Sequence, residues 1–257
     1  MVETQEEYTD DVLLDGRVRL LQPRRGHRVG SDAVLLAAAA PVTAGTIVDV
    51  GAGSGAVGLM AAAGGEASVV FVERDPALVA VCRRNIERNG LRDRARVLEA
   101  DILASSRERR SSGLIAGAAD VVLTNPPFLE EERSRVSPDA VRAAAHHLPE
   151  GGLERWIRGC ADLLKPKGRL ALIHRADRLD DCLIQLKSNF GGIVIKPIHP
   201  RQDEPANRIV ITAVKGSRAP LLIAPSLVLH EADVRFTPEA EAVHRGEAPL
   251  RMKNGRP

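Results

Sequence analysis

The apolar residues of this chain fall into short runs, and from residue 47 to residue 188 strand-like and helix-like patterns alternate. Short continuous apolar runs are typical of buried strands, whereas apolar positions at helical spacing indicate amphipathic helices. The predicted strands are 47–50, 68–72, 96–99, 120–124 and 169–174, and the predicted helices are 33–40, 56–63, 76–89, 153–164 and 178–188. Such alternation predicts an α/β fold with a Rossmann-like, doubly wound parallel sheet.

Both ends of the chain depart from this alternation. An Asp-Gly turn between the apolar runs 12–14 and 18–21 predicts a β-hairpin, which we expect to act as a flap or lid outside the core sheet, and residues 1–10 should be loosely held. Near the other end, 192–198 and 209–214 should pair as an antiparallel hairpin at the sheet edge. Short strands at 221–223 and 227–229 and a helix at 238–245 complete the prediction.

The element boundaries rest on local signals. Asp32 is the predicted N-cap of helix 33–40, and the segment 165–168 (KPKG) marks the end of helix 153–164. Residues 101–119 are predicted to form a loop, in which the charged run 107–112 is a solvated insertion. The polar stretch 129–152 predicts a mobile loop with a short helix.

Composition limits the classes of protein to which the chain can belong. Its 257 residues with 44% hydrophobic content suit a single domain, in which residues 1–40 (tail, hairpin and helix) pack on a core of residues 41–257. A net charge of +2 does not by itself indicate a nucleic-acid partner. The three cysteines lack metal-ligand spacing, so we expect buried thiols and no metal. With neither a signal-peptide layout nor a membrane-length apolar run, we expect a cytoplasmic protein without membrane attachment; its oligomeric state stays open.

The stretch IVDVGAGSGAVG (47–58) is an apolar strand that runs into a glycine-rich turn and then a helix. Glycine lets the backbone approach a ligand closely, so this order of elements predicts a nucleotide-cofactor site. Gly51, Gly53 and Ala56 also fit the dinucleotide pattern G-x-G-x-x-[GA], which leaves a nicotinamide-dependent oxidoreductase open. Glu73 follows the next apolar run at the distance expected of a carboxylate that binds ribose hydroxyls, and Asp75 competes for this role.

The strand 120–124 ends in Asn125-Pro126-Pro127-Phe128. Ligands of open parallel sheets bind at the carboxyl ends of the strands, so this tetrapeptide should face the same crevice as the glycine turn. The Asn125 carboxamide oxygen and the Pro126 carbonyl can accept both hydrogens of an –NH2 group, while Phe128 can stack on a planar substrate. The four residues therefore predict a site that presents an exocyclic amine to an electrophile.

VDVGAGSG, the acid at Glu73, EAD ending at Asp101, and LTNPPF resemble the class I S-adenosylmethionine-dependent methyltransferases over roughly residues 40–215. The NPPF tetrapeptide is shared by the adenine-N6, guanine-N2 and glutamine-N5 enzymes of that class. The flanking segments 26–39 and 197–231 resemble bacterial valine-tRNA adenine-N6 methyltransferases, whereas 129–152 matches less well. The resemblance implies a seven-stranded mixed sheet behind a hairpin, S-adenosyl-L-methionine as cofactor, and an adenine of a tRNA anticodon loop as substrate.

The resemblance also implies roles for individual residues. Gly51, Gly53 and Gly55 would line the methionine and adenosine of the cofactor, Glu73 would bind its ribose, and Asp101 with Ile102 would flank its adenine. Asp49 is a candidate neighbour of the cofactor's amino group, and Gly30, Ser31 and Asp32 would approach its methionine end. Asn125, Pro126, Pro127 and Phe128 would hold the amine that is methylated, with Asn125 also next to the cofactor.

An RNA substrate would require phosphate contacts, for which arginine is well suited. The candidates are Arg24, Arg25, His27, Arg28, Arg201 and Arg208. Other acceptors remain open: guanine N2 of rRNA, a protein glutamine, or a small molecule, including methylation on oxygen. A non-catalytic RNA-binding module is a more distant alternative.

Overall fold

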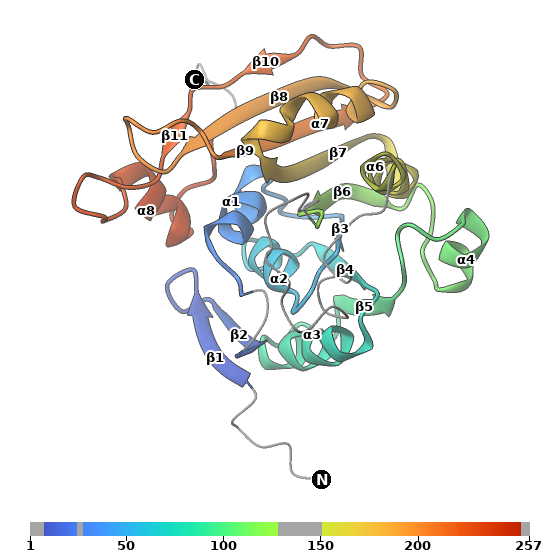
Figure 1. The fold of residues 1–257 in the computed structure, drawn as a ribbon. Helices are drawn as coiled ribbons and strands as arrows, with labels where there is room; N and C mark the ends of the chain where they lie inside the picture. The colour runs from blue at the N-terminus through green and yellow to red at the C-terminus, as the bar shows by residue number, and fades with distance from the viewer. Residues whose placement is uncertain (1–7, 25–27, 128–150, 253–257) are drawn as a thin grey trace, which may run out of the picture.

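A computed structural model describes residues 8–24, 28–127 and 151–252, in which a central sheet lies between two layers of helices (Figure 1). The strands run in the order β10-β8-β9-β7-β6-β3-β4-β5, with β11 also paired to β8. Their bounds are β3 Thr46–Val50, β4 Ser68–Glu73, β5 Ala95–Glu99, β6 Ala119–Thr124, β7 Leu164–Arg175, β8 Phe190–His199, β9 Arg208–Lys215, β10 Leu222–Ile223 and β11 Leu227–Val228.

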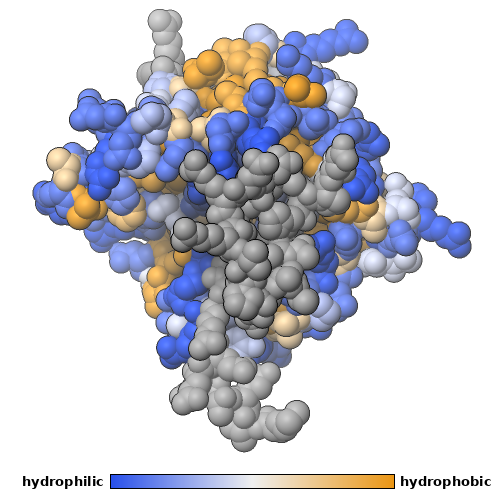
Figure 2. Space-filling model, viewed as in Figure 1, coloured by the Kyte–Doolittle hydropathy of each residue, from blue (hydrophilic) through white to orange (hydrophobic). Residues whose placement is uncertain are grey.

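Strand directions confirm the predicted mixed sheet. Among the seven longer strands, β3 to β8 are parallel to one another, and β9 runs antiparallel to both of its neighbours, β7 and β8. The two-residue strands β10 and β11 add to β8 at the edge. In β10, Leu222 and Ile223 are 48% and 71% exposed, and Figure 2 shows apolar surface near the top of this view, where Figure 1 places β10.

The helices divide between the two faces of the sheet according to the alternation of buried residues along the strands. One apolar cluster joins Ile47, Phe71 and Leu123 to helices α1, α2, α3 and α8, and the other joins Val48 and Val72 to α6 and α7. The helix bounds are α1 Ser31–Ala39, α2 Ala56–Ala62, α3 Pro76–Arg88, α4 Ser106–Ser111, α6 Gly152–Leu163, α7 Leu179–Leu186 and α8 Pro238–His244, with a 3-10 turn η1 at Ala176–Arg178.

The N-terminal hairpin, β1 (Tyr8–Leu13) and β2 (Val18–Pro23), forms a two-stranded sheet of its own. The predicted turn is confirmed, but residues 8–10 belong to β1 and are not loosely held. The hairpin is also attached more firmly than a flap: Asn85 of α3, fully buried, accepts from the Leu21 N–H and donates to the carbonyls of Leu21 and Ser54. One turn later, Asn89 makes the same pair of bonds with the backbone of Arg19.

Three predicted boundaries were wrong. The run 107–112 is largely exposed to solvent, as predicted, but it is not a loop: residues 106–111 form α4, which has a Ser105–Glu108 capping box and is held to α6 by an Arg109–Asp162 ion pair. Strand β7 begins at Leu164, directly after α6, with a register irregularity near the proline-containing start. Asp32 is not an N-cap, because α1 begins at Ser31 after Gly30, and the Asp32 carboxylate pairs with Arg208 instead.

The three cysteines are free and buried, as predicted, and burial raises the pKa of each thiol. Within the described ranges, no helix has the length and apolar character needed to cross a membrane.

We predict that Asn85→Ala lowers the free energy of unfolding by about 3 kcal/mol, because buried backbone groups of Leu21 and Ser54 lose their hydrogen-bond partner. The matched change is Asn89→Ala, which removes the same chemistry from a half-buried position and should cost about 1 kcal/mol. Urea unfolding of both variants measures the difference. A loss of about 1 kcal/mol or less in Asn85→Ala would show that the hairpin is not held mainly through Asn85.

Candidate active site

Four neighbouring strands end at one edge of the sheet, and each has, at its end or just after it, a residue that the sequence singled out. The register pairs Val50 with Thr124 and with Val72, and pairs Glu73 with Glu99. Because these strands are parallel, Asn125 after β6, Gly51 after β3, Glu73 at the end of β4 and Asp101 after β5 lie side by side. This is the carboxyl edge, where open α/β sheets bind their ligands.

The glycine turn lies at the centre of this edge. Gly51 and Ala52 both donate to the Val72 carbonyl, which fixes the start of the turn to β4. Gly53 has a φ of +57°, and a Cβ added there would meet no atom of the described residues within 4 Å, so these residues leave the space next to the turn open. Gly55 has a φ of +91°, and a Cβ there would come within 2.8 Å of the Cys82 sulfur. The first position leaves room for a ligand, and the second brings α2 close to its neighbours.

Glu73 and Asp75, which compete in the sequence for the ribose role, have different environments. Glu73 is 8% exposed; its Oε2 accepts from Gly53 at 2.8 Å, and its Oε1 accepts from the N–H groups of Arg74 and Asp75. Asp75 is exposed and caps α3 by accepting from Ala77. Only Glu73 therefore directs its carboxylate to the glycine turn.

Asp49 lies on β3 beneath the same turn and is 2% exposed. Its Oδ2 accepts the Gly58 N–H at 2.8 Å, which fixes the first turn of α2. Burial raises the pKa of the Asp49 carboxyl to about 7, and the nearby negative charge of Glu73 adds to this rise. A cation placed next to Asp49 would favour its ionised form.

Asn125 lies between two buried residues just after β6. It follows the fully buried Thr124 and precedes the buried Pro126. Among the residues that the structure describes, the buried Asn125 Oδ1 has no hydrogen-bond partner. Because an unpaired buried acceptor costs free energy, such a group indicates a site that a ligand donor can complete. Phe128 lies outside the described residues, so its predicted stacking role has no structural description.

Asp101 and Ile102 follow β5 in a tight turn. One carboxylate oxygen of Asp101 accepts from the Leu103 N–H at 2.8 Å. Ile102 is 3% exposed and lies against α6, since a Cβ on Gly159 would come within 2.8 Å of its side chain.

Gly30, Ser31 and Asp32 begin α1 at the same edge of the sheet. Asp32 pairs at 3.0 Å with Arg208, the first residue of β9, and Arg208 is paired in the sheet with Arg175 at the end of β7. Ser31 contacts His244 of α8 at 3.0 Å. Within the described ranges, no hydrogen bond joins these three residues to the glycine turn.

The sequence reasoning missed Thr124 and Trp156. The Trp156 Nε1 donates to the Thr124 hydroxyl at 2.9 Å, and that hydroxyl donates to the Val50 carbonyl at 3.0 Å. A Cβ on Gly51 would lie 3.0 Å from the indole ring, so Trp156 also packs directly against the glycine turn. The only available signal was that Trp156 is the single tryptophan of the chain.

Several of the arginines proposed for RNA contacts are engaged within the protein. Arg28 pairs with Asp11, Arg201 with Glu204 and Arg208 with Asp32. Arg24 is exposed, and Arg25 and His27 lie outside the described residues. The structure therefore assigns no RNA contact to this set.

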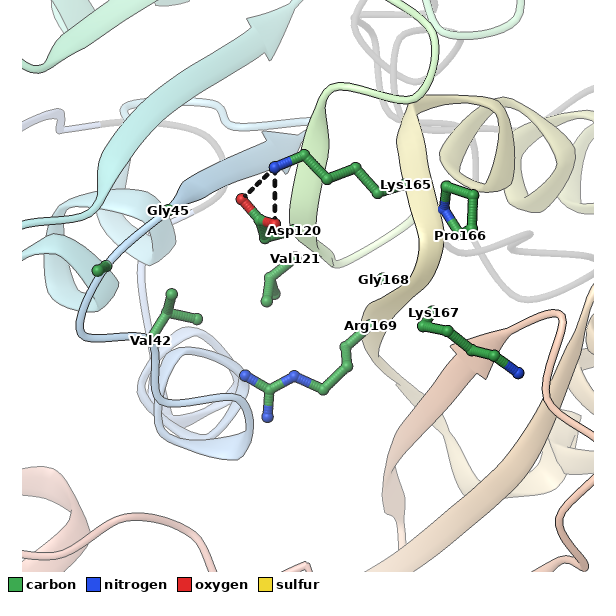
Figure 3. Close-up of a pocket in the computed structure, with 10 residues that line it drawn as sticks. Val42, Gly45, Asp120, Val121, Lys165, Pro166, Lys167, Gly168 and Arg169 are labelled. Carbon is green, nitrogen blue, oxygen red and sulfur yellow. Dashed lines mark hydrogen bonds and ion pairs between the residues drawn. The ribbon is translucent and has the colours of Figure 1, made fainter.

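A hollow of about 610 Å³ lies at the opposite, amino edge of β3, β6 and β7 (Figure 3). Lys165 reaches into it and binds both carboxylate oxygens of Asp120, at 2.8 and 2.9 Å. Lys167 and Arg169 donate to the backbone carbonyls of Gly216 and Pro41. Because this hollow is separated from the four strand ends by the length of the sheet, it is not the candidate active site. In the part of the chain that the structure describes, no group of three or more His, Cys, Asp or Glu residues could hold a metal ion.

Comparison with known proteins shows that the chain is similar to methyltransferases. A family model described as "Methyltransferase small domain" matches residues 27–157. A tRNA1(Val) (adenine(37)-N6)-methyltransferase of Porphyromonas gingivalis is 39% identical over 60% of this chain, and the match spans 61% of that relative's length. The enzyme of the same name from a Shewanella strain is 31% identical over 76% of this chain and 74% of its own.

Among solved structures, a predicted O-methyltransferase of Agrobacterium tumefaciens is 34% identical and covers 87% of this chain and 100% of its own, with a TM-score of 0.73. The sheet order and the strand-end site define a fold of the class I methyltransferase type. More narrowly, the chain belongs to the methyltransferase small domain family.

We predict that Asp49 makes stability fall as pH rises towards neutrality. With its pKa raised from 3.8 to about 7, the folded protein holds a proton between these values that the unfolded chain releases. Asp49→Asn removes this term, so the unfolding free energy of the variant minus that of the wild type should increase by roughly 2 kcal/mol between pH 5 and pH 7. Urea unfolding at both pH values measures it; a difference independent of pH would contradict the assignment.

Proposed function

We propose that this chain is an S-adenosylmethionine-dependent methyltransferase that modifies an exocyclic amine of a planar base, adenine N6 in tRNA. The observation that carries the proposal is the buried Oδ1 of Asn125, which follows the strand next to the glycine turn and has no hydrogen-bond partner among the described residues. An acceptor in this place suits an amine donor. The tRNA adenine-N6 methyltransferases among the relatives support adenine as the base.

The strand-end residues fit S-adenosylmethionine, which when bound would supply an electrophilic methyl group. The open position at Gly53 leaves space at the turn, and Glu73 offers a buried carboxylate for ribose hydroxyls. Asp101 and Ile102 provide an acceptor and an apolar surface at the next strand end, suited to an adenine ring. Asp49 and the start of α1 are the proposed neighbours of the methionine end.

In this proposal the chain contributes mainly by positioning. Asn125 Oδ1 and the Pro126 carbonyl accept the two hydrogens of the target amine and so orient its lone pair, while Phe128 stacks on the base. Holding two reactants in the correct geometry can supply a large part of a rate enhancement without a protein nucleophile. An adenine in a structured RNA loop must be splayed out to reach such a site.

A second candidate is methylation of a hydroxyl group. The relative that matches over its whole solved length is described as a predicted O-methyltransferase, which favours this alternative. A hydroxyl group has one hydrogen to donate, whereas an –NH2 group has two. Methylation of a hydroxyl would therefore need only one hydrogen-bond acceptor in the site, and methylation of an amine would need both Asn125 Oδ1 and the Pro126 carbonyl.

The test is transfer of radiolabelled methyl groups from S-adenosylmethionine into total tRNA, rRNA and protein from a strain that lacks this gene, followed by analysis of the labelled product. The proposal expects N6-methyladenosine in tRNA. Label in guanosine, in protein glutamine or on a sugar or small-molecule oxygen would contradict it and would identify the alternative instead.

In the same assay, Asn125→Ala should lower turnover by at least about a hundredfold, because an acceptor aimed at the reacting amine is lost. Binding of S-adenosylhomocysteine, measured by calorimetry, should change little. The protein should remain folded, since the Oδ1 has no hydrogen-bond partner to lose within residues 8–24, 28–127 and 151–252. Asn189→Ala, before β8 at the opposite edge of the sheet, is the matched control and should retain turnover. Near-normal turnover in Asn125→Ala would reject the assigned role.

A further inference from the structure

We propose that Thr124 and Trp156 are positioning residues that hold the cofactor turn and Asn125 in register with each other. The proposal rests on the function proposed above, because it concerns the alignment of the methyl donor with the amine acceptor. Neither residue is proposed to contact the reacting atoms.

The contacts form a short chain across three elements. Trp156 on α6 donates its indole N–H to the Thr124 hydroxyl at 2.9 Å, and the Thr124 hydroxyl lies 3.0 Å from the Val50 carbonyl oxygen. An indole N–H can only donate, so the hydroxyl accepts from Trp156 and uses its own hydrogen to bond to Val50. The direction of both hydrogen bonds is therefore determined.

The place of this bridge makes it relevant to the site. Val50 immediately precedes Gly51, and Thr124 immediately precedes Asn125. These two residues are also the last matched pair of the β3–β6 ladder. Beyond them the strands separate into two loops, so the hydroxyl links the strands at the last point before the donor side and the acceptor side diverge.

The bridge is shielded from water. Thr124 and Val50 are fully buried and Trp156 is 7% exposed. Hydrogen bonds in such surroundings are costly to leave unmade, so the preferred arrangement is narrowly defined. The Thr124 hydroxyl also makes two hydrogen bonds that an apolar side chain of the same shape could not make.

Helix α6 also packs against two of the loops that follow the strands. The indole ring packs against Gly51, where an added Cβ would lie 3.0 Å from Cζ2 and 3.1 Å from Cη2. One turn further along α6, Gly159 abuts Ile102 after β5. A shift of α6 would therefore displace residues at the ends of β3, β5 and β6, which are three of the four strand ends that make up the site.

The alternative is that Thr124 and Trp156 only fill the core. Two variants distinguish the positioning role from the packing role. Thr124→Val keeps the shape of the side chain and loses the hydroxyl, whereas Thr124→Ser keeps the hydroxyl and loses a methyl group. If positioning is the role, turnover follows the hydroxyl; if packing is the role, both variants lose activity in proportion to their folded fraction.

The experiment measures kcat, KM and S-adenosylhomocysteine affinity for the wild type, Thr124→Val, Thr124→Ser, Trp156→Phe and the Val/Phe double variant, at a temperature where circular dichroism shows each to be folded. We expect Thr124→Val to lower kcat by about tenfold or more, since small misplacements of reactants are costly. Cofactor-product affinity should stay within about twofold, and Thr124→Ser should restore most of kcat. The combined loss of kcat in the Val/Phe double variant should be smaller than the product of the two single losses, because each single change already removes the Trp156–Thr124 hydrogen bond.

Thr212→Val on β9 is the matched control: it makes the same substitution in the same sheet, away from the strand-end loops, and should leave kcat unchanged. Equal kcat losses in Thr124→Val and Thr124→Ser, or wild-type kcat in Thr124→Val, would overturn the proposal.

A readout that needs no acceptor substrate separates this proposal from the proposed function. Because the chain has one tryptophan, its indole N–H gives a single proton resonance. It should exchange slowly in the wild type and in Thr124→Ser, exchange faster in Thr124→Val, and shift when S-adenosylhomocysteine binds. If the wild type methylates none of the substrates offered, the proposed function fails. If, in addition, the indole resonance changes neither when S-adenosylhomocysteine binds nor in Thr124→Val, the proposed positioning role of Thr124 and Trp156 is overturned as well.

Discussion

The parallel pairing of β6, β3, β4 and β5 is the constraint on which the rest of the site depends. Parallel strands with matched register must end at a common edge, so residues far apart in the chain become neighbours there. Val50 is paired with both Thr124 and Val72, which leaves Gly51, Asn125 and Glu73 next to one another. The remaining features of the site adjust positions that this pairing has already set.

Polar groups buried around the strand ends refine the arrangement. Glu73 accepts from Gly53, Asp49 from Gly58, and Thr124 joins the two central strands by its hydroxyl. Each of these groups is satisfied, whereas the buried Asn125 Oδ1 has no partner in the part of the chain that the structure describes. Paired supporting groups around one buried acceptor that the described residues leave unpaired are typical of a preorganised binding site.

The sequence was most informative where local chemistry determines the outcome. Short apolar runs predicted the strands, and Asp-Gly predicted the hairpin turn, because these signals depend on neighbouring residues alone. The position of Asn125 beside the glycine turn also followed, since it needs only the rule for parallel strand ends. Long-range contacts were the main source of error. Asp32 was predicted to be an N-cap, but its carboxylate binds Arg208, which lies 176 residues away in the chain.

The same reason explains α4 and Trp156. The sequence S-x-x-E at 105–108 is a capping-box pattern, but the charged run after it favoured a loop prediction. The ion pair between Arg109 and Asp162 joins residues far apart in the chain, so it leaves no local pattern in the sequence. Trp156 bonds to Thr124 across 32 residues and packs against Gly51, and neither contact leaves a local pattern.

The central claim is that the ends of β3 and β6 form one donor–acceptor site. It is tested most directly by a crystal structure of the chain with S-adenosylhomocysteine. The account predicts a ligand that lies across the ends of β3 and β4, with its ribose on Glu73 and its sulfur facing the Asn125 carboxamide. A ligand bound at the amino edge near Lys165, or with its sulfur directed away from Asn125, would contradict it.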